Sequence, residues 1–175
     1  MTETERKNRI LRMAVYIASG RSDKDPGKYL SRDLAEEISG LPDYSQETGP
    51  DPGWYCIDLG ASLEEMDEDG SVWIRYPVND KYRNGLGNLQ GGLLASLIDN
   101  AMGILVVPFY GSFLTMNLDT NYFLPISKEF EQIVIKAEIV KPGKRTKYLR
   151  AEVYRSDGKL AALAGSNVMM VRKKG

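Results

Sequence analysis

The stretch from Gly92 to Val107 constrains the fold more than any other part of the sequence, because it is apolar around almost its whole circumference when written as a helix. Its inward face repeats at helical spacing, with Leu94, Ile98, Ala101 and Leu105 widened by Leu93, Leu97 and Ile104. A helix with so little polar surface is buried on most sides. We expect Pro108 and Gly111 to end it. The rest of the chain must therefore supply a layer that covers this helix.

Strand patterns lie on both sides of this helix in the sequence. Two precede it, at Trp54–Leu63 and Ser71–Val78, and an acidic turn at Glu64–Gly70 joins them. Four follow it, at 112–124, 130–141, 146–155 and 160–172. The first of these four has an alternating apolar face, formed by Leu114, Met116, Leu118, Tyr122 and Leu124. The order β-β-α-β-β-β-β predicts an α+β fold, in which an antiparallel sheet curls around one long central α-helix.

The first 50 residues have a different pattern from the rest. Two short helices are expected at 4–19 and 30–39, the second capped by Ser31 and ended by Gly40. The segment Leu41–Gly53 contains three prolines and two glycines, which is typical of a loop. We therefore expect an N-terminal helical extension and linker over 1–50, followed by the main domain over 51–175.

The composition excludes several kinds of chemistry. The 175 residues include no histidine and one cysteine, so Ser-His-Asp and Cys-His catalysis are absent and no metal site is expected. The net charge of −1 does not favour nucleic acid or an anionic membrane as a partner. No apolar run is expected to serve as a secretion signal or a membrane span. These features predict a cytoplasmic protein.

Asp99 is out of place in the apolar helix. On a helical wheel it shares a lane with small residues, namely Gly92, Ala95, Ser96 and Gly103. Small neighbours leave room beside the carboxylate for a ligand or for a second chain. Burying an unpaired carboxylate costs several kcal/mol. Asp99 therefore either caps a backbone group, pairs with Arg or Lys across an interface, or takes part in chemistry.

The loop before this helix carries groups that suit a carbonyl substrate. Gly91 and Gly92 lie at the predicted helix N-terminus, where backbone N–H groups lack intrahelical partners and the helix dipole favours negative charge. Glycine also lets a ligand approach the backbone closely. Asn84 offers a second donor through its side-chain amide. Such donors stabilise a carbonyl oxygen that becomes an oxyanion, although Gly-Gly before a helix is also typical of a plain turn.

Taken together, the segment from Asn84 to Gly92 (NGLGNLQGG) followed by Asp99 resembles the active-site segment of hotdog-fold acyl-CoA thioesterases. It is most similar to the phenylacetate-pathway (PaaI-like) group, whose pattern is Asn-x-x-Gly-x-x-His-Gly-Gly with an acid nine positions after the histidine. Here Gly87 falls at the matching position too, and Gln90 replaces the histidine. The similarity extends over roughly 54–172, which implies a hotdog fold for the main domain.

The resemblance implies a role for each residue of the motif. Asn84 and the Gly91 amide would polarise the thioester carbonyl, and Asp99 would act as the general base or as the nucleophile. Thr115 matches a hydroxyl residue that helps to position water. Gln90 and Gly92 would contact the substrate, and Gln90 can form hydrogen bonds but cannot take a proton.

The resemblance also implies a substrate and an assembly. Coenzyme A carries several phosphates, so Lys141, Lys144 and Arg145 are candidates for its binding; a solvated hairpin turn explains the same cluster. No cofactor is needed beyond the coenzyme A of the substrate itself. Two chains usually pair in this fold, giving a dimer or a dimer of dimers with the site at the subunit interface.

Two other functions are compatible with this sequence. The first is a non-catalytic protein that binds or senses acyl-CoA, for which Gln90 in place of histidine is an argument. The second is an enoyl-thioester hydratase, but those sites pair an acid with histidine, which this chain lacks. A thioesterase is the function that the residues favour.

Overall fold

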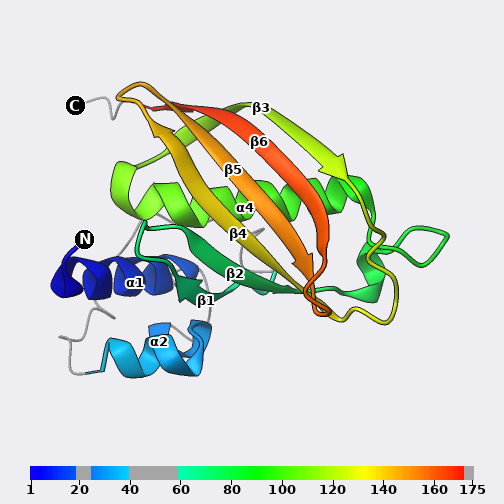
Figure 1. Ribbon diagram of the computed structural model, residues 1–175, viewed down its shortest axis with the longest axis horizontal. Coiled ribbons are helices and arrows are strands. Elements are labelled where there is room, and N and C mark those ends of the chain that lie inside the picture. The colour runs from blue at the N-terminus through cyan, green and yellow to red at the C-terminus, as the bar shows by residue number, and fades with distance from the viewer. Residues whose placement is uncertain (19–24, 40–58, 172–175) are drawn as a thin grey trace.

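A curled antiparallel sheet wraps around the long helix α4 in the computed structural model, which describes residues 1–18, 25–39 and 59–171 (Figure 1). The helices are α1 (Glu3–Ala18), η1 (Pro26–Tyr29), α2 (Arg32–Glu37), η2 (Asp80–Tyr82) and α4 (Gly91–Tyr110). The strands are β1 (Ser62–Met66), β2 (Val72–Pro77), β3 (Phe113–Tyr122), β4 (Gln132–Pro142), β5 (Thr146–Arg155) and β6 (Leu160–Met170). This arrangement confirms the predicted α+β hotdog architecture.

The described part of the sheet has six strands in the order β1-β2-β4-β5-β6-β3. All neighbouring strands are antiparallel, and hairpins join β4 to β5 and β5 to β6. The chain crosses under the sheet through α4 between β2 and β3, so β3 pairs with β6 at the opposite edge from β1 (Figure 1).

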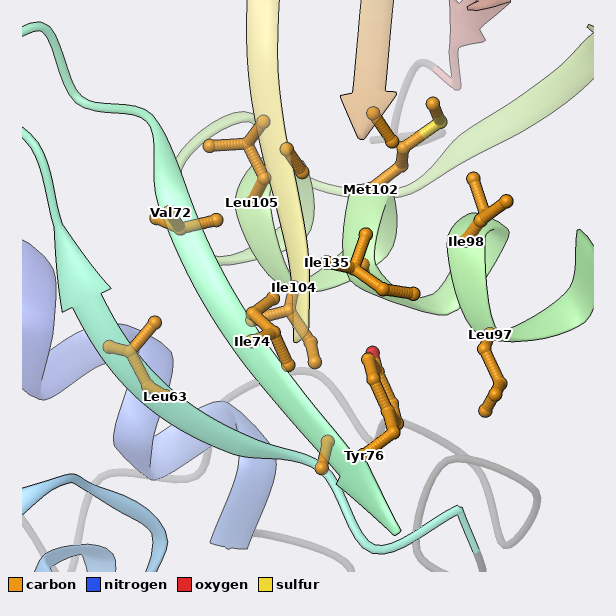
Figure 2. Packing of buried hydrophobic residues seen from close by; sticks show 14 of the residues in the cluster. Leu63, Val72, Ile74, Tyr76, Leu97, Ile98, Met102, Ile104, Leu105 and Ile135 are labelled. Carbon is orange, nitrogen blue, oxygen red and sulfur yellow. The ribbon is translucent and has the colours of Figure 1, made fainter. Parts of the chain in front are cut away.

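Helix α4 is buried because aliphatic side chains from the sheet cover it. Ile98, Ile104 and Leu105 are almost completely buried against Ile74 and Ile135 from the strands (Figure 2). Each such side chain contributes about 1.5–3 kcal/mol through removal from water. Although α4 has the length and composition of a membrane-spanning helix, half of the relevant window is buried inside the fold. It therefore serves here as the core helix of the sheet.

One polar pair lies within this apolar layer. The Tyr76 hydroxyl, which points toward α4 in Figure 2, donates to Asn100 Oδ1 at 2.7 Å. Asn100 follows Asp99 directly and faces the core, so the two adjacent polar residues of α4 have opposite surroundings. The buried bond favours this rotation of the helix about its axis, because another rotation would break it.

The N-terminal helices cover the edge formed by β1. Ile10, Met13 and Ile17 of α1 belong to the same hydrophobic cluster as the sheet and α4. Just before α2, the Ser31 amide donates to the Leu63 carbonyl at 2.8 Å, and the Ser31 hydroxyl donates to the next carbonyl at 2.6 Å. Ser31 also caps α2, as its sequence position predicts. This segment therefore forms hydrogen bonds with backbone carbonyls that would otherwise be exposed at the outer edge of β1.

Two predicted boundaries are wrong. β1 runs to Met66 and so includes part of the stretch that was expected to be the acidic turn. Glu64 is stabilised in the strand because its Oε1 lies 2.9 Å from Arg75 Nη2 on the neighbouring strand. The predicted start at Trp54, Cys56 and the loop 41–53 lie outside the described residues. Helix α4 continues past Pro108 and ends at Gly111, whose positive φ of 81° suits glycine. Pro108 sits in the last turn, where its missing N–H removes only one helical bond.

The predicted apolar face of β3 is also wrong in its first half. The register with β6 shifts between Thr115 and Asn117, so Met116 is an extra, bulged residue. Met116 and Leu114 are consequently exposed, at 60% and 57%, whereas Leu118 packs against the core. In a regular strand Thr115 and Leu118 would face opposite sides. The bulge turns both toward α4.

Candidate active site

Asp99 lies about halfway along α4, on the side of the helix that faces β3. Its Oδ1 accepts a hydrogen bond from the Thr115 hydroxyl at 2.8 Å. Within the described parts of the chain, no lysine or arginine forms an ion pair with Asp99. The carboxylate keeps Oδ2 free for a ligand or water.

The lane of small residues around Asp99 is open. Ala95, Ser96 and Gly103 are half-buried and Gly92 is exposed, although the opposite face of α4 is fully buried. A side chain placed on Gly103 would meet no atom within 4 Å. Glycine in the middle of a helix costs about 1 kcal/mol relative to alanine, and no positive φ or close contact within the chain requires it here. Among the described residues, the space beside Asp99 is thus left open.

The start of α4 leaves two adjacent backbone donors without partners. Gln90 is the N-cap, and its Oε1 accepts from the Leu93 amide at 3.1 Å. The Leu94 amide donates to the Gln90 carbonyl at 3.0 Å. The amides of Gly91 and Gly92 are then the donors of the first turn with no acceptor in the described chain. They point outward along the helix axis, where the dipole favours a negative charge.

Asn84 organises the loop that precedes α4. Its Oδ1 accepts from the amides of Leu86 and Asn88 at 2.9 and 3.2 Å, which leaves Nδ2 as the remaining donor. Gly87 adopts a positive φ of 79° to close this turn. The loop is further held by Arg83, whose guanidinium donates to the carbonyls of Gly87, Ile126 and Phe130. Asn84 therefore combines a structural acceptor with a free donor.

The donors and the acid are far apart within one chain. Asp99 lies eight positions after Gly91, which corresponds to about 12 Å along the helix axis at 1.5 Å per residue. A carbonyl held at the helix N-terminus is consequently out of reach of a water molecule on the Asp99 of the same chain. Thr115 lies next to Asp99, and Gln90 lies next to Gly92 at the helix start. Within one chain, the structure does not bring the first pair close to the second.

The three cations proposed for phosphate binding lie on the turn between β4 and β5. Lys141, Lys144 and Arg145 are exposed, and this turn is close to the C-terminal end of α4 (Figure 1). Their neighbour Lys147 is instead 5% exposed, and its Nζ donates to the Gly143 carbonyl at 3.1 Å and lies over the Tyr110 ring. The exposed three are free to meet an anion, whereas Lys147 stabilises the turn.

Sequence reasoning missed one residue at this site. Tyr122 was expected on the apolar face of its strand, but its hydroxyl donates to the Gly91 carbonyl at 2.8 Å. The contact joins the last residue of β3 to the first residue of α4. No signal in the sequence could have revealed it, because it depends on the phase of β3 after the bulge at Met116.

Comparisons with known proteins bear on the family and the fold of the chain. Residues 86–162 match the family model described as the thioesterase superfamily. The human acyl-coenzyme A thioesterase 13 is 31% identical over 96 residues, which cover 53% of this chain and 68% of that protein. The mouse protein of the same name is 32% identical over 88 residues, covering 49% and 62%.

Solved structures show the same fold. A phenylacetic acid degradation-related protein from Ralstonia eutropha superposes with a TM-score of 0.63 at 26% identity, covering 71% of this chain and 94% of its own. The PaaI protein of E. coli gives 0.60 at 21%, covering 66% and 82%. A thioesterase protein from Streptococcus pneumoniae, solved with coenzyme A, gives 0.59 at 23%, covering 66% and 88%.

Proposed function

The chain belongs to the thioesterase superfamily, and on this premise we propose that it hydrolyses acyl-CoA thioesters to a carboxylic acid and free coenzyme A. The observation that carries the proposal is the Asp99 carboxylate, which is bonded to Thr115, has no cation partner among the described residues and opens onto a lane of small residues. An acid kept accessible in an otherwise apolar helix has a chemical use.

Asp99 acts as the general base in this proposal. Oδ2 takes a proton from water while the water oxygen attacks the thioester carbonyl. The resulting oxyanion accepts hydrogen bonds from the Gly91 amide and Asn84 Nδ2. The intermediate then collapses, the C–S bond breaks and the thiolate of coenzyme A takes up a proton. Thr115 holds Oδ1, so it fixes the carboxylate for this step.

The alternative is that Asp99 attacks the carbonyl itself and forms a transient anhydride. Hydrolysis in ¹⁸O-labelled water distinguishes the two routes under single-turnover conditions. Direct attack by water places the label in the released acid. In the anhydride route, by contrast, an unlabelled Asp99 oxygen can leave with the acid and the label can remain on the enzyme.

The complete site requires two copies of the chain. Because Asp99 and Gly91 are about 12 Å apart along one helix, Asp99 of one protomer works with Asn84 and Gly91 of its partner. The edge strand β3 supports this pairing, since it carries the exposed apolar residues Leu114, Met116 and Tyr122 beside the open lane of α4. Gln90 and Gly92 line the same helix start. Lys141, Lys144 and Arg145 receive the phosphates of coenzyme A.

Substitution of Asp99 by asparagine tests the function. We expect Asp99→Asn to abolish release of free thiol from a panel of short, long and aromatic acyl-CoAs, because asparagine cannot take a proton. Folding and the oligomeric state should be unchanged, since the side chain keeps its shape. Asp33→Asn, which alters an exposed acid on α2, is the matched control and should retain full activity.

The same experiment separates the alternative function. A protein that only binds or senses acyl-CoA would release no thiol in its natural form while still binding a non-hydrolysable analogue. Gln90, which caps α4 and carries no titratable proton, is the feature that favours this alternative. An Asp99→Asn variant with the natural rate would remove Asp99 from the mechanism.

A further inference from the structure

Tyr122 makes the one side-chain hydrogen bond to the Gly91–Gly92 peptide among the described residues. Its hydroxyl donates to the Gly91 carbonyl oxygen at 2.8 Å. Its ring also lies against Gly91, since a Cβ added there would be 3.4 Å from Tyr122 Cζ. The ring itself is half-exposed, at 50%. The main contact of Tyr122 is therefore its hydroxyl hydrogen bond, and not burial of the ring in the core.

The bond to the Gly91 carbonyl also affects the Gly92 N–H at the other end of the same peptide. The Gly91 carbonyl and the Gly92 N–H belong to one planar unit, so a bond that fixes the oxygen also fixes the direction of the N–H. A hydrogen bond to a carbonyl polarises the whole peptide and makes its N–H a stronger donor, by about 10–30%. The Gly92 amide has no acceptor in the described chain.

We propose that Tyr122 is a positioning residue for thioester hydrolysis, and that through the Gly91–Gly92 peptide it aims the Gly92 N–H as a further donor to the oxyanion. This inference rests on the proposed function. Gln90 leaves this donor free because its cap is directed to the Leu93 amide instead. A Cβ at position 92 would lie 3.1 Å from Gln90 Oε1, so glycine there leaves the cap undisturbed.

The strand supplies Tyr122 with the correct phase. β3 runs antiparallel to the first half of α4, so Thr115 reaches Asp99 and Tyr122 reaches Gly91. Both contacts lie on the same side of β3 only because of the bulged residue at 116. β3 thus contacts the acid through Thr115 near one end and the peptide that carries the backbone donors through Tyr122 at the other end.

The Tyr122→Phe substitution tests the inference, because it removes the hydroxyl and keeps the ring. We expect kcat and kcat/KM to fall together by about tenfold with KM unchanged, less than the ~10²-fold loss of a direct oxyanion donor. The Gly92 amide signal in a ¹⁵N-labelled sample should shift. Tyr154→Phe is the matched control: it also removes one hydroxyl hydrogen bond, to Glu152 at 2.6 Å, but on β5 and away from α4.

The outcomes separate this inference from the proposed function. If the natural protein releases thiol and Tyr122→Phe does so at the same kcat, Tyr122 has no positioning role while the thioesterase function stands. A rise in KM alone, or a loss of stability that accounts for the lower rate, would also overturn the inference in favour of a structural role. If the natural protein hydrolyses none of the acyl-CoA panel, the proposed function fails and the catalytic role of Tyr122 fails with it.

Discussion

Asn84 and Asp99 show how far residue identity alone predicts a site. The apolar surroundings of Asp99 indicated an acid that is paired or used, and the spacing of the glycine-rich loop indicated where donors would lie. The structure places the Thr115 hydroxyl on Asp99 Oδ1, and the implied role of Thr115 in positioning water stays a prediction. The cap made by Gln90 could not be foreseen, because it depends on the extended conformation of one residue at the helix start.

At this scale, we expect Asn84→Ala to lower turnover about 10²-fold through loss of one oxyanion donor. The structure adds that alanine also removes the acceptor for the Leu86 and Asn88 amides, so the loop itself is disturbed. Asn84→Asp separates these effects, because it keeps the acceptor and lacks the N–H donor. It should lose a comparable factor in kcat while urea unfolding stays close to that of the natural protein.

A natural rate in the Asn84→Asp variant would mean that Nδ2 does not contact the substrate. A rate lost only in the alanine variant would assign Asn84 to loop structure.

The elements of the fold are predicted well where periodicity is strong and poorly where a local irregularity intervenes. β5 begins and ends at the predicted residues, and α4 exists as expected but extends to Tyr110. β3 has the predicted extent to within two residues at its C-terminal end and one at its start, yet half of its face is inverted. A bulge adds a residue without any composition signal, so strict alternation cannot reveal it.

The hairpin between β5 and β6 gives an element-scale prediction about pH. A hydrogen bond from Arg155 holds the pKa of the Asp157 carboxyl at about 2, below its ordinary 3.8. The ionised form is therefore favoured by folding, and its contribution to stability is present above pH 3.8 and lost as the pH falls toward about 2. Arg155 also donates to the Pro125 carbonyl, so the pair ties this hairpin to the segment before β4.

We expect Asp157→Asn to flatten the decline of the unfolding free energy over this acid range, measured by urea unfolding at a series of pH values. Asp33→Asn is the control for removal of an exposed acid. A variant that follows the natural pH dependence would show that the Arg155–Asp157 pair does not contribute to acid stability.

At the scale of the whole molecule, the sequence predicted that a sheet covers the long helix, but it did not predict how the N-terminal helices pack against them. Periodicity identified the helix at the N-terminus, and the structure places its apolar face in the same core as the sheet. The contacts between the N-terminal helix and the sheet link residues more than 50 positions apart in the sequence, as in the hydrogen bond from Arg6 to the Met66 carbonyl. A local sequence pattern carries no information on contacts between such distant positions. The division at residue 50 remains a prediction.

A mixing experiment tests the proposed two-chain site. Asp99→Asn and Asn84→Asp each damage both sites of a homodimer. A mixed dimer, however, combines the intact Asp99 of one protomer with the intact Asn84 of the other. After subunit exchange at equal amounts, we expect recovery to about a quarter of the natural rate, because half of the dimers are mixed and each has one working site. No recovery above the sum of the two variants would place the site within one chain.

The hydrogen bonds of Ser31 to β1 have a consequence for growth of the sheet. An antiparallel sheet with two bare borders can add copies of itself without end, which is how fibres begin. Here the chain's own N-terminal segment bonds to the Leu63 and Glu64 carbonyls at the β1 border, whereas the outer edge of β3 has no neighbouring strand in the described sheet. If the site combines two chains as proposed above, pairing through β3 alone joins two copies into one sheet, and the N-terminal segment blocks further addition of strands at β1.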